Sequence, residues 1–288
     1  MTAPTPTTIA PGIYPDMTNE AYHSGPGISK TGLDWIGGPD SCPALFRAKY
    51  ITKEIEDKET DALAFGKAGH LAVFQPDMFG AEVAVCPEIN KRTNSGKAEY
   101  ASFCAENVGK TIIKPEDYEI VMRVAEAVRK NPIARNILEK GQAETSIFST
   151  DESTGELVKV RPDWLVEDVI ADLKLMRSAS PSHFEKEMYN RRYFVQAPFY
   201  MDVAGGQLGR QINSFVFIVA EKEPPYLVEL YFANPEAVEA GRIEYRRNLN
   251  TYHRCRVTDE WPGYNGGVIQ PVSVPYWALR NLDTAIAD

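Results

Sequence analysis

The stretch VIADLKLM, residues 169–176, constrains the fold most, because two charged residues interrupt an apolar run rich in β-forming residues. Asp172 and Lys174 are two residues apart, so on a β-strand their side chains share one face while Leu173 points to the other. The strand is apolar enough to be central in a sheet, where an unpaired charge would be costly. The fold must therefore bury this strand and still supply partners for a carboxylate and an ammonium group.

A second carboxylate precedes this strand. Asp163 lies in VRPDWLV, nine residues before Asp172, and a hairpin would place the two acids opposite each other. Two carboxylates at that distance repel unless a cation lies between them, and such oxygen ligands suit Mg²⁺ or Mn²⁺. Lys174 could then position or activate the water that attacks a substrate. In the alternative interpretation, Asp163 ends a turn, and Asp172 and Lys174 form an exposed edge pair.

Three further segments carry candidate site residues. His70 lies in GKAGHLAVF (66–74), an apolar helical segment whose two glycines allow a close backbone approach. As a third ligand it would favour Mn²⁺ as well as Mg²⁺, although a histidine packed in the core gives the same pattern. Gln196 and Tyr200, in QAPFY, are four residues apart and share one face of a helix, where they could orient a phosphate backbone. Glu144, at the start of ETSIF, is a fourth candidate acid.

The chain alternates between helical and extended patterns, which predicts a single α/β domain. Helical patterns dominate residues 28–140, and short β-forming runs at 143–175 are expected to be three neighbouring antiparallel strands. A helical segment at 182–203, two further strands and a charged helix at 235–253 follow. The predicted division is a partly ordered N-terminal arm (1–27) and one domain (28–288), made of a mainly helical part (28–140), a catalytic core (141–258) and a C-terminal wrap (259–288).

Composition and charge exclude several classes of protein. The longest apolar run, FVFIVA, is far shorter than the ~20 residues that span a bilayer, so no membrane segment is expected. The N-terminal sequence lacks the basic and apolar regions of a secretion signal, which predicts a cytoplasmic protein. The four cysteines are scattered, which argues against a zinc knuckle or a disulfide framework. Because the net charge is −9, nucleic acid would have to bind in a local basic groove.

These motifs in this order resemble the PD-(D/E)xK nuclease superfamily, in its RecB-like branch, and within that the RecE (exonuclease VIII) type of phage and prophage exonuclease. The resemblance extends from YHSGPGISKTGLDWI (22–36) through GKAGH, AETSIF, VRPDWL, ADLK and QAPFY to FIVAEKEPPY (217–226). It implies a restriction-endonuclease-like core, which is a central mixed sheet flanked by helices.

The resemblance also implies an activity and partners. It implies an exodeoxyribonuclease that uses one or two Mg²⁺ or Mn²⁺ ions per active site. The enzyme would degrade linear double-stranded DNA from 5′ ends and leave a 3′ single strand for a single-strand annealing recombinase. A ring-like homo-oligomer in a bacterial cell is implied as well.

The resemblance carries over to single positions of this sequence. It implies metal ligands at His70, Asp163 and Asp172 with the Leu173 carbonyl as a fourth, a catalytic lysine at Lys174, a catalytic acid at Glu144, and DNA contacts at Gln196 and Tyr200. One departure is the run after Asp-Leu-Lys, where small hydroxyl residues are common in the family and Leu175-Met176 stands here. The departure concerns DNA contacts just beyond the site.

Basic residues near these motifs are candidate phosphate contacts. Arg161 is two residues before Asp163 and is expected to share its strand face, which makes it the foremost candidate. Arg191 and Arg192 directly precede the QAPFY helix and are the next candidates.

Two other functions compete with the nuclease interpretation. A single-strand nuclease of the RecB-like kind with an iron–sulfur cluster would need one early and three clustered late cysteines, whereas only Cys255 is late, so no cluster is expected. A non-catalytic DNA-binding or assembly module could retain the fold. It would have no physical need to keep a histidine, two aspartates and a lysine buried together.

Overall fold

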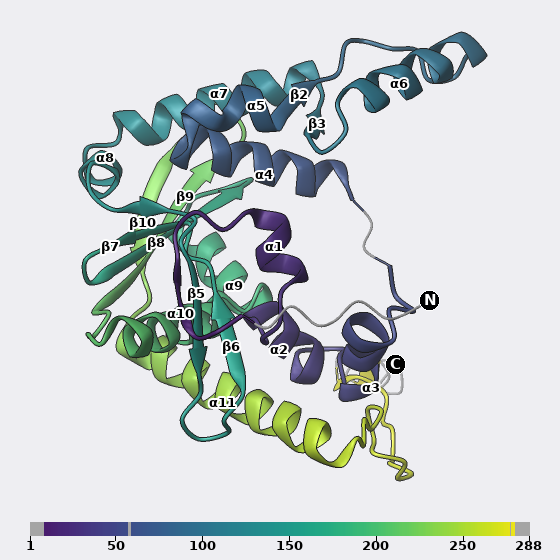
Figure 1. Ribbon diagram of the computed structural model, residues 1–288, viewed down its shortest axis with the longest axis vertical. Coiled ribbons are helices and arrows are strands. Elements are labelled where there is room, and N and C mark those ends of the chain that lie inside the picture. Colours follow the sequence, from purple (N-terminus) through teal and green to yellow (C-terminus); the bar gives the residue numbers. More distant parts are fainter. Residues whose placement is uncertain (1–8, 57–58, 277, 280–288) are drawn as a thin grey trace, which may run out of the picture.

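The computed structural model describes residues 9–56, 59–276 and 278–279 (Figure 1). Its helices are α1 (Asn19–Ser24), α2 (Lys30–Gly37), α3 (Pro43–Phe46), the π-helix η1 (Arg47–Ile51), α4 (Asp61–Phe74), the 3₁₀-helix η2 (Pro76–Met78), α5 (Phe79–Glu82), α6 (Asn94–Glu106), α7 (Pro115–Lys130), α8 (Pro132–Leu138), α9 (Pro181–Asn190), α10 (Tyr193–Leu208) and α11 (Pro235–Thr258). Its strands are β1 (Gly12–Tyr14), β2 (Val83–Val85), β3 (Thr111–Ile113), β4 (Gln142–Ala143), β5 (Ser146–Thr150), β6 (Leu157–Val160), β7 (Trp164–Val166), β8 (Val169–Met176), β9 (Ser214–Glu221) and β10 (Val228–Phe232).

A mixed five-stranded sheet in the order β10-β9-β8-β7-β4 forms the centre of the fold. Strands β8 and β9 are parallel along their full length, and the other neighbours are antiparallel. A second, antiparallel sheet has the order β1-β5-β6, and β2 and β3 form a short parallel pair. The predicted α/β class with a central mixed sheet flanked by helices is therefore confirmed (Figure 1).

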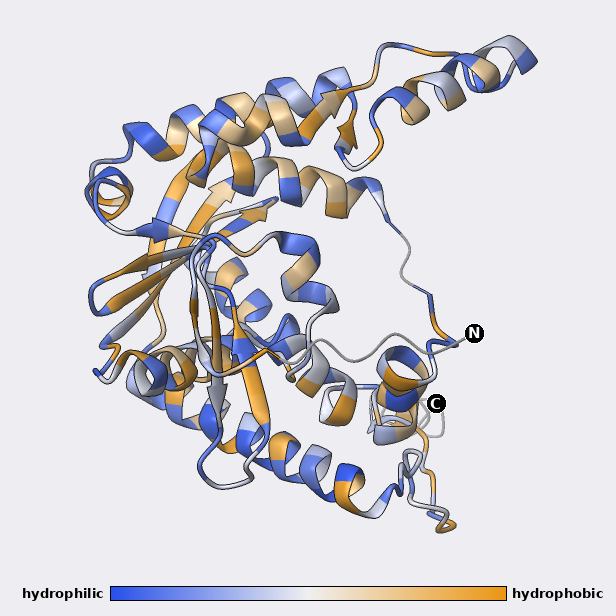
Figure 2. Cartoon of the chain, in the orientation of Figure 1, coloured by the Kyte–Doolittle hydropathy of each residue, from blue (hydrophilic) through white to orange (hydrophobic). Residues whose placement is uncertain are grey.

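Helices cover both faces of the sheet, and β8 contributes alternate residues to each side. Ile170 and Met176 belong to an apolar cluster with residues of α10 and α11, whereas Ala171 and Leu173 belong to a second cluster with residues of α4 and α7. The apolar colour in Figure 2 follows the central strands between these helices. Because side chains alternate along a strand, Asp172 is directed to the α10 side. No helix in the described ranges combines the length and apolar character that crossing a membrane requires.

The predicted strands between residues 143 and 175 are more fragmented than expected. Glu144, which has a left-handed φ of 50°, separates β4 from β5. Pro162 lies between β6 and β7, where its missing N–H cannot extend a ladder. The segment therefore forms five strands in two sheets instead of three adjacent strands.

The helical segment predicted at 182–203 is likewise divided. Arg192, with a φ of 56°, separates α9 from α10. The predicted charged helix at 235–253 is confirmed as α11 and extends to Thr258. In the N-terminal arm, β1 pairs with β5, so the described part of this arm belongs to the second sheet. Residues 1–8 of the arm and 280–288 of the predicted wrap lie outside the described residues.

Helix α10 contains a proline whose effect explains how closely α11 packs on it. Pro198 has no N–H, so the carbonyl of Phe194, four residues earlier, has no partner within the helix. Gly241 of α11 lies against this carbonyl, and a Cβ atom at Gly241 would be 1.8 Å from the Phe194 oxygen. The close contact of the two helices thus depends on a glycine at this position.

We expect Gly241→Ala to destabilise the protein by about 3 kcal/mol, because the new methyl group would force two packed helices apart. Thermal or urea unfolding measures this loss. Gly206→Ala is the matched control, since Gly206 lies in α10 and a Cβ atom there would have no other atom within 4 Å, and alanine favours a helix over glycine. Equal stability of Gly241→Ala and wild type would contradict this packing.

Candidate active site

The hairpin of β7 and β8 brings the two predicted aspartates together. Trp164 pairs with Ala171 across the antiparallel strands, so Asp163, one residue before β7, lies beside Asp172. The backbone N–H of Leu173 donates to Asp163 Oδ2 at 2.9 Å. The carboxylate of Asp163 is thereby fixed to the strand that carries Asp172.

Helix α4 adds the imidazole. A Cβ atom at Gly69 would be 2.3 Å from Cδ1 of Leu175, so α4 approaches β8 closely at this glycine. His70 follows it, and His70 Nδ1 lies 3.1 Å from Asp163 Oδ2. Gly66 has no atom within 4 Å of a Cβ position, so the expected close approach holds for Gly69 and not for Gly66. Leu175, which departs from the family pattern, fills the space next to α4.

Glu144 lies where the chain passes from one sheet to the other. Its backbone N–H donates to the carbonyl of Asp163 at 3.1 Å, and its Oε2 accepts from Arg161 Nε at 2.8 Å. Ligand atoms of His70, Glu144 and Asp163 all lie within 4.8 Å of one another, and each of these residues is partly buried. Three candidate metal ligands from three separate segments of the chain therefore lie close together.

Asp172 and Lys174 form a second group beside the first. Lys174 Nζ lies 2.5 Å from Asp172 Oδ2 and donates to Gln196 Oε1 at 3.1 Å. Gln196 Nε2 in turn donates to Asp172 Oδ1 at 2.6 Å. The ring of Tyr193 lies under the ammonium, 4.2 Å from Nζ to its centroid. Two residues of α10 thus hold the buried ion pair, as the alternation along β8 requires.

The pKa values of the site respond to this crowding. Burial lowers the pKa of His70, but the charge of Asp163 and the hydrogen bond to it outweigh burial and raise the pKa to about 9. Burial also lowers the pKa of Lys174, but the charge of Asp172 outweighs burial, so the pKa is raised. Burial and then the charge of Asp163 raise the pKa of both Asp172 and Glu144. The negative charges of the site carboxylates are therefore only partly balanced by the positive charges next to them.

The donor set fits a divalent cation. Carboxylate oxygens and an imidazole are ligands that such ions accept. Asp172 Oδ2 is buried and, apart from its ion pair with Lys174, has no hydrogen-bond partner. His70, Glu144 and Asp163 could hold an ion directly, and Asp172 could join them through this oxygen, which already lies beside the Lys174 ammonium. The predicted ligands His70 and Asp163 are thus brought together with Glu144, while Asp172 lies outside that group of three.

Comparison with known proteins identifies the family of the chain and a structure with the same fold. A family model described as a PDDEXK-like domain of unknown function (DUF3799) matches residues 35–270. The chain belongs to this PDDEXK-like family. A crystal structure described as a "Putative exonuclease" from Eubacterium rectale shares the fold with a TM-score of 0.62 and 14% identity, covering 92% of this chain and 98% of that one. No curated protein matches the sequence significantly.

In this PDDEXK-like domain, the predicted DNA-binding residues differ from one another in how far they are exposed. Tyr200 lies one turn after Gln196 on α10, and burial raises its pKa well above the usual value. Arg191 is exposed over 68% of its side chain and forms an ion pair with Glu187. Arg191 ends α9, whereas Gln196 lies in the first turn and Tyr200 in the middle of α10.

Two of the predicted arginines are engaged inside the protein. Arg192 is 10% exposed at its side chain and binds Asp34 at 2.8 Å and Glu244 at 2.7 Å. Its position supports the start of α10 and leaves little surface for a phosphate. The expectation that Arg161 shares a strand face with Asp163 is wrong, because Pro162 separates β6 from β7. Arg161 instead points to Glu144.

Sequence reasoning assigned no role to Tyr22 or Ser146, which also lie at the site. The ring of Tyr22, a buried residue of α1, lies 5.6 Å from the Arg161 guanidinium. The hydroxyl of Ser146 accepts a hydrogen bond from Arg161 at 2.6 Å. Tyr22 has no distinctive signal in the sequence, because the arm also contains Tyr14 and two isoleucines.

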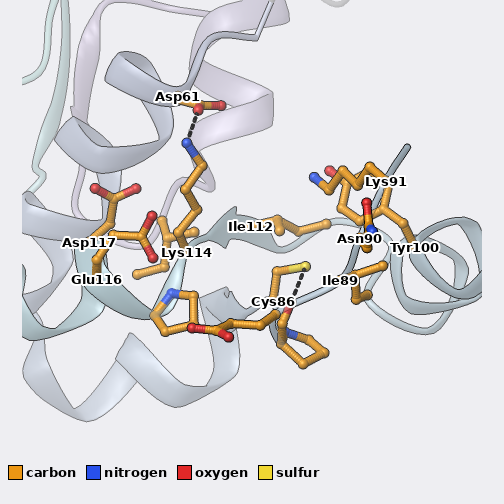
Figure 3. Close-up of a pocket in the computed structure, with 14 residues that line it drawn as sticks. Asp61, Cys86, Ile89, Asn90, Lys91, Tyr100, Ile112, Lys114, Glu116 and Asp117 are labelled. Carbon is orange, nitrogen blue, oxygen red and sulfur yellow. Dashed lines mark hydrogen bonds and ion pairs between the residues drawn. The ribbon is translucent and has the colours of Figure 1, made fainter. Parts of the chain in front are cut away.

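A cavity of about 530 Å³ lies away from these residues, between the β2–β3 pair, the loop before α6 and the start of α7. Figure 3 shows Lys114 extended toward Asp61, 2.6 Å away. On its other side, Lys91 lies over the ring of Tyr100. None of the candidate site residues lines this cavity.

The His70–Asp163 ion pair predicts how stability depends on pH in EDTA. The pKa of His70 is raised from 6.5 to about 9, so its contribution is fully present below about pH 6.5 and is lost as the pH rises through about 9. We expect Tm to fall over this window in wild type and to fall less in His70→Gln. Thermal unfolding from pH 6 to 9.5 measures both, and equal slopes would contradict the ion pair.

Proposed function

We propose that the protein is a metal-dependent exodeoxyribonuclease that degrades linear double-stranded DNA 5′ to 3′ by phosphodiester hydrolysis and produces 3′ single-stranded overhangs. The observation that carries this proposal is the buried Asp172–Lys174 pair beside the joint group of His70, Glu144 and Asp163. The fold shared with an exonuclease-named structure supports an exonuclease. The resemblance to RecE-type enzymes supports the polarity.

The cofactor we propose is one or two Mg²⁺ or Mn²⁺ ions, held by His70, Asp163, Glu144 and Asp172 with the Leu173 carbonyl. When bound, such ions neutralise the charge of the scissile phosphate and lower the pKa of a water molecule. The carboxylates concentrate negative charge in one place, which attracts a divalent cation. The imidazole keeps softer divalent ions such as Mn²⁺ among the acceptable ones.

Lys174 would act as a charged donor. The neighbouring Asp172 raises the pKa of its ammonium against the effect of burial, so it remains protonated at neutral pH. A protonated lysine can orient the attacking water or bind a phosphate oxygen, but it cannot accept the proton of that water. Gln196 holds both members of the pair and so fixes the direction of the ammonium.

DNA would approach along the end of α10 that adjoins the site. Arg191, at the end of α9, has the exposure that a phosphate contact needs, and Gln196 and Tyr200 follow on α10. The buried Arg192 supports this helix end from below through its two ion pairs. A few local contacts of this kind would allow an acidic protein to bind DNA ends.

The biological setting we propose follows from the resemblance. It comprises a ring-like homo-oligomer, a single-strand annealing recombinase that receives the 3′ strand, and a cytoplasmic role in recombination encoded by a phage or prophage. Each of these features accompanies RecE-type exonucleases.

We expect Asp172→Asn and Lys174→Met to remain folded and to lose DNA digestion by about 100-fold or more, since the first removes the charge of a proposed metal ligand and the second removes the ammonium that would orient the water or bind the phosphate. The raised pKa of Asp172 lets it take up a proton when Lys174 is replaced. Digestion of linear duplex, with circular dichroism for folding, measures the effect. EDTA should abolish digestion, and Mg²⁺ or Mn²⁺ should restore it.

Lys114→Met is the matched control, because it removes a lysine–carboxylate pair that is exposed and remote from the site. It should digest DNA like wild type. Wild-type rates in either site variant, or digestion in EDTA, would overturn the nuclease assignment.

The polarity is tested with linear duplex labelled at either the 5′ or the 3′ ends, alongside closed circular duplex and single-stranded DNA. We expect early release of the 5′ label and an intact circle, since an exonuclease requires an end. Early release of the 3′ label would reverse the polarity. Cleavage of the circle would indicate an endonuclease, and faster digestion of the single strand would favour a single-strand RecB-like nuclease.

A further inference from the structure

The contacts of Arg161 are those of a brace inside the protein. Its Nε donates to Glu144 Oε2 at 2.8 Å, and its Nη1 donates to Ser146 Oγ at 2.6 Å and to the carbonyl of Met17 at 2.9 Å. Only 11% of its side chain is exposed. The guanidinium therefore joins three parts of the chain: the Glu144 carboxylate, the start of β5 and the N-terminal arm. These contacts and the low exposure leave little of the guanidinium for a phosphate to bind.

The backbone of Glu144 does not by itself determine where its carboxylate lies. The residue has a left-handed φ of 50° between β4 and β5, and its N–H is fixed to the Asp163 carbonyl. From this anchored backbone, a side chain with two methylene groups can adopt several rotamers. The hydrogen bond from Arg161 selects the one that places the carboxylate near His70 and Asp163.

The described part of the N-terminal arm, residues 9–27, presents the Met17 carbonyl from a fixed position. Before Met17, β1 pairs with β5. After Met17, the ammonium of Lys159 donates to the carbonyls of Tyr22 and Gly25, each at 2.7 Å. The N–H of Ile28 then donates to the carbonyl at the start of β6. Contacts on both sides of Met17 thus fix the arm without any help from Arg161.

We propose that Arg161 is a positioning residue that holds Glu144 in the metal-binding group and uses the Met17 carbonyl of the N-terminal arm as its brace. The arm is then a part of the metal centre although it supplies no ligand. This inference rests on the proposed function, because it requires a divalent cation to bind at His70, Glu144 and Asp163. It replaces the expectation that Arg161 binds a DNA phosphate.

Mn²⁺ affinity of the full-length protein, measured by calorimetry without DNA, tests this role. We expect Arg161→Met to weaken Mn²⁺ binding by about 10- to 100-fold, which is typical of a lost outer contact to a ligand. Glu144→Gln removes the charge of a ligand itself and should weaken binding at least as much. The double variant should bind no more weakly than Glu144→Gln alone, because Arg161 acts through Glu144. A residue that merely stabilises the fold would not show this dependence.

Arg161→Lys tests whether the hydrogen bonds of the guanidinium are needed or whether a positive charge is sufficient. Lysine keeps the positive charge but lacks the planar fork that reaches Glu144, Ser146 and Met17 together. We expect it to bind Mn²⁺ about as weakly as Arg161→Met does. Full recovery by lysine would show that charge is sufficient and would overturn the brace.

Arg246→Met is the matched control, because it removes a guanidinium that pairs with a buried carboxylate, Asp151, elsewhere in the protein. It should bind Mn²⁺ like wild type even if Tm falls. Unchanged or tighter binding by Arg161→Met, or additive losses in the double variant, would overturn the proposal.

A parallel DNA digestion separates this inference from the function on which it rests. If the single and double variants lose Mn²⁺ affinity non-additively but the wild type digests no DNA, the inference is supported and the nuclease is refuted. Normal DNA digestion with additive losses would refute the inference and leave the nuclease. A wild-type protein that neither binds Mn²⁺ nor digests DNA would refute both.

Discussion

The ion pair between Asp172 and Lys174 on a buried strand is the constraint on which the catalytic half of the structure depends. Charges taken out of water are tolerated only when partners replace the lost hydration. The partners come from a different element, since Gln196 of α10 bonds both charged residues and the ring of Tyr193 lies under the ammonium. Helix α10 therefore has to lie against this face of the sheet.

The position of each surrounding helix follows from local features that permit close contact. Gly69 lets α4 approach β8, and this brings His70 to Asp163. Pro198 frees a carbonyl of α10 that Gly241 of α11 covers, and this packs the second helix layer behind the first. The site thus depends on the packing of small and apolar residues as well as on its charged groups.

Sequence patterns predicted the parts of the site that lie on regular elements. The alternation along β8, the hairpin with Asp163 and the helix carrying His70 follow from side-chain periodicity, which a sequence displays directly. Periodicity gives no information on where a chain leaves one sheet for another. For that reason the left-handed Glu144 between β4 and β5 and the break at Pro162 were missed as strand boundaries.

The partners of the arginines could not be predicted from the sequence either. A basic residue beside a site suggests a phosphate contact, but its partners depend on distant segments that only the fold brings near. Arg192 binds Asp34 of α2 and Glu244 of α11, and Arg161 binds the arm. Neither pairing has a sequence signal, because more than 100 residues separate Asp34 from Arg192 and Met17 from Arg161.

Anomalous diffraction at the manganese edge, from crystals grown with Mn²⁺, tests the central claim most directly. The account predicts a peak within coordination distance of His70, Glu144 and Asp163, with the Lys174 ammonium alongside it. Crystals that take up manganese elsewhere on the protein, while this group of side chains stays without a peak, would contradict the account.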